Sequence, residues 1–132
     1  MQITVQLLSQ CPQHQDAVLA GLQNQWPGIY VPDEPTQNTW VLLNGDIPLG
    51  SVSVLPEENP PETPELWVAF LWVHPDHRRQ GLATLLLKEV VRGEPHRPLF
   101  LWTETKILHG TLLNLGWVQV EDYPERQVYT RV

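Results

Sequence analysis

The stretch from Val73 to Thr84, VHPDHRRQGLAT, constrains this chain more than any other. It follows an unbroken apolar run, Leu66 to Val73, that predicts a buried strand, and it precedes an apolar-periodic segment, Leu82 to Val91, that predicts a helix. The first amides of a helix have no partner inside it and lie at the positive end of its dipole. Gly81 has no Cβ to block an approaching group, and two arginines precede it. The stretch therefore predicts a binding site for an anion such as a phosphate.

Length, net charge and cysteine content limit the kind of protein that carries this site. A length of 132 residues predicts a single domain, residues 1–132, that is large enough to bury a core. The formal net charge of −7 argues against nucleic acid or an anionic membrane as a partner. Cys11 is the only cysteine, so no internal disulfide can form, and a reducing compartment is expected. No signal peptide or long apolar run is seen, and we expect a cytoplasmic protein.

Apolar periodicity and turn residues predict the elements in order. Strands are expected at Met1–Ser9, Thr39–Leu43, Pro48–Leu55, Glu65–Val73, Leu99–Trp102, Trp117–Val120 and Gln127–Val132, and helices at Pro12–Trp26, Gly81–Gly93 and Thr105–Leu115. In the second helix, Leu82, Leu85, Leu86 and Val90 form the expected buried stripe. Gly50 predicts a bulge, and the Pro-rich segment 56–64 predicts a long acidic loop. The fold class is therefore α+β, a mixed sheet in the order β-α-β-β-β-α-β-α-β-β.

This order, with its loop after the fourth strand, resembles the Gcn5-related N-acetyltransferase (GNAT) family. The family's phosphate-binding signature is matched by Arg78-Arg79-Gln80-Gly81-Leu82-Ala83, and its lead-in by Val73-His74-Pro75. Asn114-Leu115-Gly116-Trp117 looks like the family's turn into the sixth strand, and Leu99 to Thr103 looks like its fifth strand. The resemblance extends over nearly the whole chain.

The resemblance implies the GNAT acyl-CoA N-acyltransferase fold, with acetyl-CoA as the cosubstrate and no metal. It implies that the pantetheine arm runs along the fourth strand and that the loop cradles the pyrophosphate. The residues implied in binding are Leu71, Trp72, Val73, Arg78, Arg79, Gln80, Gly81, Leu82, Ala83 and Thr84. The expected reaction is the direct attack of a primary amine on the thioester, with one group accepting the proton of the amine and another protonating the thiolate.

The catalytic residues are where the chain departs from the family. The usual acid is a tyrosine four residues before the glycine in the turn into the sixth strand, and that position is Leu112 here. Four substitutes are considered: Glu65, His74, Glu104 and His109. Each also has an ordinary structural explanation as a solvated charge, a loop residue or a helix cap. The acid and the base stay unassigned by the sequence.

The sequence leaves the acceptor and the role open. A small or peptidyl amine is the expected acceptor, and the acidic composition favours a cationic one. The alternative is a catalytically weak module that binds CoA and regulates a protein partner, which the missing tyrosine supports. A different phosphate ligand for the loop is a third hypothesis, and a homodimer is also left open. Turnover of amines separates the enzyme from the module.

Overall fold

The computed structural model describes residues 2–28, 38–56, 65–103, 107–122, 124 and 126–131. Its strands are β1 (Ile3–Leu7), β2 (Thr39–Asn44), β3 (Ile47–Pro56), β4 (Leu66–Val73), β5 (Leu99–Thr103), β6 (Val118–Asp122) and β7 (Gln127–Arg131). Its helices are α1 (Gln15–Gln25), α2 (Leu82–Gly93) and α3 (His109–Asn114), with 3-10 turns at Leu8–Gln10, Pro12–His14 and Pro75–His77. The predicted element order is confirmed.

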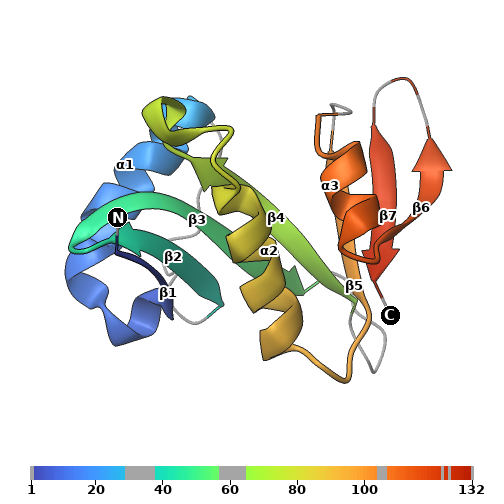
Figure 1. Ribbon diagram of the computed structural model, residues 1–132, viewed down its shortest axis with the longest axis horizontal. Helices are drawn as coiled ribbons and strands as arrows, with labels where there is room; N and C mark the ends of the chain where they lie inside the picture. Colours follow the sequence, from blue (N-terminus) through green and yellow to red (C-terminus); the bar gives the residue numbers. More distant parts are fainter. Residues whose placement is uncertain are drawn as a thin grey trace.

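The strands form one seven-stranded sheet in the order β1-β2-β3-β4-β5-β7-β6 (Figure 1). Strands β4 and β5 are parallel, as predicted, and every other neighbouring pair is antiparallel. The last strand of the chain, β7, lies between β5 and β6. This inserted strand places Tyr129 beside Leu101 of β5, one strand in from the edge of the sheet.

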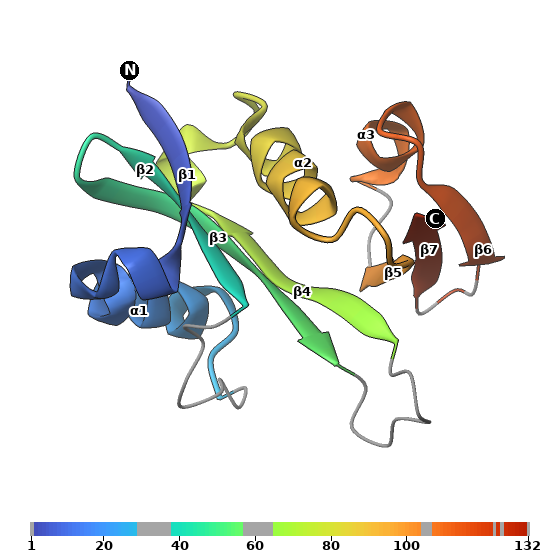
Figure 2. The same cartoon turned by 90° about the horizontal axis from the view of Figure 1, so that it is seen from below.

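The helices cover opposite faces of the sheet, with α1 on one side and α2 and α3 on the other (Figure 2). The core under α1 consists of Leu8, Cys11, Val18, Leu22, Val41, Leu43 and Trp72. The core under α2 and α3 includes Leu42, Val52, Val68, Leu86, Val90, Leu101, Leu112 and Tyr129. Strand β4 supplies residues to both cores, which explains why its sequence is apolar without alternation. No helix among the described segments is long and apolar enough to cross a membrane.

Two details of the predicted helices are wrong. In α2 the buried residues are Leu82, Leu86, Leu87 and Val90, whereas Leu85 is 39% exposed. At 100° per residue, Leu85 lies outside the arc that these four side chains occupy. The third helix begins at His109, and Ile107 lies in the preceding turn with 86% of its surface exposed. Residues 105 and 106, where this helix was predicted to start, lie outside the described residues.

The predicted bulge near Gly50 is confirmed. The register between β2 and β3 shifts so that Leu42 is opposite Gly50 while Leu43 is opposite Pro48. A Cβ at Gly50 would lie 2.5 Å from the carbonyl oxygen of Trp72, so close contact with β4 requires glycine there. Most of the predicted acidic loop lies outside the described residues.

Candidate functional site

The loop between β4 and α2 has the backbone of an anion site. Arg79 has φ +65° and Gly81, the residue before α2, has φ +76°. The first helical hydrogen bond joins the amide of Leu85 to the carbonyl of Gly81 at 3.3 Å, and no side chain caps the helix. The three amides before Leu85 therefore have no acceptor inside the helix. Apart from its chain neighbours, no described residue comes within 4 Å of a Cβ built on Gly81, so the space around this position is open.

The two arginines of this loop have different roles. Arg78 donates from Nε to the carbonyl oxygen of Val73 at 3.1 Å and from Nη2 to Oε1 of Gln25 at 2.6 Å. It therefore ties the loop to the end of β4 and to the last residue of α1. Arg79 is exposed and makes no contact of this kind with the described part of the chain. Its guanidinium is available to an anion, whereas Arg78 already donates two of its five N–H groups to protein.

Beside this loop, β4 and β5 separate. They pair over three rows only, of which the last joins Val68 to Leu101, although β4 continues to Val73. The separation coincides with a bulge at Phe70, which has φ +55° and interrupts the register between β3 and β4. Beyond the bulge, the backbone of β4 pairs with β3, and no strand of the described residues pairs with its other edge. An extended ligand with amide groups could pair with that edge.

These features can be compared with what coenzyme A, the cosubstrate that the family resemblance implies, requires of its binding site. A pyrophosphate needs amide donors and room, and the loop offers both at Gly81. A pantetheine arm carries two amides and needs a free strand edge, which residues 71–73 of β4 provide. The carbonyl of Val73 is the exception, because Arg78 already donates to it. The predicted binding residues are therefore contiguous in space, and they fit coenzyme A.

The three catalytic candidates that the structure describes are not brought together. Glu65 is exposed just before β4, at the end where β4 and β5 are still paired. His74 is half-buried at the other end of β4, and its Nδ1 accepts a hydrogen bond from the amide of Asp76 at 3.2 Å. Glu104 lies outside the described residues. His109 begins α3, and its Nδ1 lies 2.7 Å from the hydroxyl oxygen of Tyr129.

The sequence did not single out Tyr129, which the structure places beside the candidate His109. Its ring is fully buried among the core residues under α3, and burial together with the charge of Asp122 raises the pKa of its hydroxyl. Leu112, which occupies the position of the family's usual tyrosine, is also fully buried. The sequence predicted only that Tyr129 lies in a strand, Gln127–Val132. Its contact with His109 depends on β7 lying beside β5, which no local pattern indicates.

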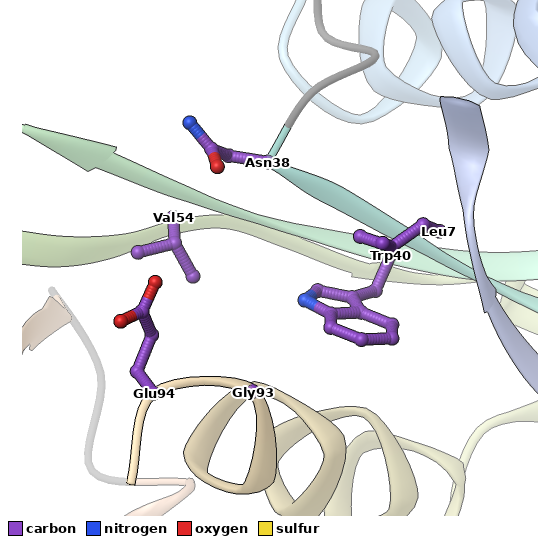
Figure 3. Close-up of a pocket in the computed structure, with 6 residues that line it drawn as sticks. All are labelled: Leu7, Asn38, Trp40, Val54, Gly93 and Glu94. Carbon is purple, nitrogen blue, oxygen red and sulfur yellow. The ribbon is translucent and has the colours of Figure 1, made fainter. Parts of the chain in front are cut away.

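Two cavities of about 160 and 110 Å³ lie away from this loop. The first is lined by Leu7, Asn38, Trp40, Val54, Gly93 and Glu94, at the far end of α2 (Figure 3). The second is bordered by the middle of α2, the end of α3 and β7. Both are smaller than typical ligand pockets of about 300–1,000 Å³. The open loop and the free strand edge are better candidates for the functional site than either cavity.

Comparisons with known proteins bear on the family and the fold of this chain. The model of the acetyltransferase (GNAT) family matches residues 4–105. A structure of Arabidopsis thaliana Naa50 in complex with a bisubstrate analogue, CoA-Ac-MVNAL, has a TM-score of 0.72 at 13% identity, covering 100% of this chain and 99% of that one. Escherichia coli ElaA has a TM-score of 0.73 at 13% identity, covering 98% and 99% of the two chains.

N-acetylglutamate synthase from Neisseria gonorrhoeae, complexed with coenzyme A and N-acetyl-glutamate, has a TM-score of 0.68 at 15% identity. That match covers 99% of this chain and 35% of that one. No curated protein sequence matches this chain. At such low identities these structures establish the fold alone, and the family match over residues 4–105 carries the assignment.

Proposed function

Because this chain belongs to the GNAT acetyltransferase family, we propose that it transfers the acetyl group of acetyl-CoA to a primary amine. The observation that carries the proposal is the position of the anion loop at the end of a strand whose outer edge is free. The loop binds the pyrophosphate through amides, and the edge of β4 directs the ligand to the point where β4 and β5 separate. Acetyl-CoA supplies a thioester with a good leaving group.

The strands β4 and β5 would then orient the two reactants. Pairing along β4 beyond Phe70 holds an extended ligand, and the separated strands admit a second molecule between them. The neutral amine nitrogen forms a bond to the carbonyl carbon, and the bond from carbon to sulfur breaks. The amine loses one proton and the leaving thiolate gains one, so the reaction releases no net proton. Free backbone amides of β4 would stabilise negative charge on the carbonyl oxygen, as in an oxyanion hole.

The net charge of −7 supports a cationic acceptor such as a polyamine, an aminoglycoside-like compound or a lysine side chain. Among solved neighbours, Naa50 is complexed with a bisubstrate analogue that contains a peptide, and N-acetylglutamate synthase with an acetylated amino acid. The fold is thus found with acceptors of different size. We propose a small or peptidyl cationic amine, for which the Michaelis constant should rise with ionic strength.

The experiment is a thiol-release assay with acetyl-CoA and a panel of amines. The panel contains spermidine, an aminoglycoside, a lysine peptide and a peptide with an acidic N-terminus. Release of CoA that depends on one amine, with the acetylated product identified by mass spectrometry, supports the enzyme. Tight binding of CoA without turnover of any amine supports the alternative, a regulatory module, which the buried Leu112 at the usual tyrosine position favours. Failure of CoA to raise the melting temperature would overturn both.

A further inference from the structure

His109 and Tyr129 form a polar pair above the row where β4 and β5 separate. Val68 pairs with Leu101, the last β5 residue that contacts β4 in register, and Leu101 pairs with Tyr129. Tyr129 is therefore two strands, or about 10 Å, from β4 on the same cross-strand row. His109 lies over this row, because its Nδ1 is 2.7 Å from the Tyr129 hydroxyl.

The surrounding helices place this pair beside the path of the proposed cosubstrate. Helices α2 and α3 lie on the same face of the sheet (Figure 2). Helix α2 begins at the anion loop and packs on β3 and β4, while α3 packs beside β6. A ligand that extends from the loop to the separated strands would reach the face that α2 and α3 share, and His109 lies in the first turn of α3.

The direction of the hydrogen bond follows from the burial of Tyr129. Its ring is fully buried, and within the described part of the chain its hydroxyl has His109 Nδ1 as its single polar partner. If Nδ1 carried the proton and donated it, the hydroxyl hydrogen of Tyr129 would be buried without an acceptor. An unsatisfied buried donor costs about 1–3 kcal/mol. The favourable arrangement therefore has Tyr129 donating to an unprotonated Nδ1, and the neutral ring carries its hydrogen on Nε2.

The hydroxyl of Tyr129 stays protonated at neutral pH and can donate, because burial and the charge of Asp122 raise its pKa above the ordinary value. The ring of His109 is half-buried, and its Nε2 is not among the buried side-chain atoms that lack a partner. No described residue accepts from that nitrogen. The Nε2–H group is thus open to solvent or to a ligand. A neutral imidazole in this state donates a hydrogen bond and offers no lone pair at the exposed nitrogen.

We propose that Tyr129 is a positioning residue that fixes the Nε2–H tautomer of His109, so that His109 donates a hydrogen bond to negative charge developing on the thioester. This inference rests on the proposed acetyl transfer. His109 would thus supply a hydrogen-bond donor in a chain that has Leu112 in place of the usual tyrosine. In this role His109 keeps the proton on Nε2 throughout the reaction. This role differs from that of a general base. His74 has the same tautomer, because its Nδ1 accepts from the Asp76 amide, so neither histidine offers an exposed lone pair.

The first measurement is the tautomer itself, in the protein without ligand. Long-range proton–nitrogen NMR correlations of the His109 ring, assigned by comparison with His109→Gln, should show the hydrogen on Nε2. In Tyr129→Phe, which retains the ring and lacks the hydroxyl, the ring should shift toward a mixture of tautomers. A wild-type ring protonated on Nδ1, or an unchanged tautomer in Tyr129→Phe, would overturn the positioning role.

The second measurement is turnover with the best amine of the panel. His109→Ala should lower kcat about 100-fold while the dissociation constant of acetyl-CoA stays unchanged. His109→Gln, which keeps an N–H donor, should recover part of that loss, and Tyr129→Phe should lower kcat more than it changes KM. Unchanged kcat in His109→Ala would overturn the catalytic role. A wild-type protein that acetylates no amine would overturn the proposed function and this role together, while NMR still decides the tautomer.

Discussion

Arg78 donates a hydrogen bond from Nε to the carbonyl oxygen of Val73, and this contact closes the loop between β4 and α2. The same guanidinium donates to Gln25, so one side chain connects the loop, β4 and α1. Arg79, its neighbour, is exposed and turned by a positive φ. Two adjacent arginines that look equivalent in the sequence thus divide into one that holds the loop and one that is available to a ligand.

We expect Arg79→Ala to weaken CoA binding about tenfold, because it removes one charge-assisted contact to phosphate. Arg78→Ala should also weaken CoA, through a less ordered loop, and should lower the free energy of unfolding by about 1 kcal/mol. Isothermal titration and chemical denaturation measure the two quantities. Arg92→Ala, which removes the same charge at the other end of α2, should leave CoA affinity unchanged. Equal loss of affinity in all three would mean that overall charge, not the loop, attracts CoA.

Gly81→Glu should abolish CoA binding, because a side chain and a negative charge would occupy the proposed pyrophosphate path. Gly45→Glu is a matched control, since Gly45 has φ +60° and open space around its Cβ position, as Gly81 does. Both variants should lose about 1–2 kcal/mol of stability from the left-handed backbone. Denaturation curves measure the loss of stability, and titration of the folded variants with CoA measures the affinity. Full affinity in Gly81→Glu would remove the loop from the binding site.

The bulge in β4 predicts a reversal of the usual order of glycine and alanine in a strand. Phe70 has φ +55°, so Phe70→Gly should be about 1 kcal/mol more stable than Phe70→Ala. Both variants lose the ring that contacts Trp26, with centroids 6.0 Å apart, and their difference isolates the backbone. At the preceding strand position, Ala69→Gly should cost about 0.5–1 kcal/mol. Urea denaturation gives these differences, and a Phe70→Ala variant as stable as Phe70→Gly would contradict the bulge.

Alkaline pH should destabilise the protein through Cys11. Burial raises the pKa of this thiol above 9.0, and its Sγ donates to the carbonyl of Leu7 at 3.4 Å. The folded chain therefore holds a proton that the unfolded chain releases, so the free energy of unfolding falls as pH rises above about 9. Tyr129, whose pKa is raised above 10.0, acts with the same sign at higher pH. Cys11→Ala should flatten the pH dependence between pH 9 and 10, as denaturation at several pH values would show.

Local patterns in the sequence were sufficient for the parts of the site that are contiguous in the chain. The apolar run before Pro75, the arginine pair and Gly81 predicted a strand, a loop and a helix start, and the structure places them in that order. Short-range sterics and helix geometry decide such elements, and these act between residues close in sequence. The bulge beside Gly50 was predicted for the same reason, because glycine marks close backbone contact.

The tertiary structure alone decided how distant segments combine. The bulge at Phe70 has no glycine to announce it, and it arises where β4 separates from β5. The pair of His109 and Tyr129 joins residues 20 positions apart, and it exists because β7 lies between β5 and β6. Arg78 and Arg79 differ in their contacts because the end of α1 lies beside the loop and accepts a hydrogen bond from Arg78. The sequence predicted where a phosphate should bind, while strand order and packing decided which side chains lie near the point where β4 and β5 separate.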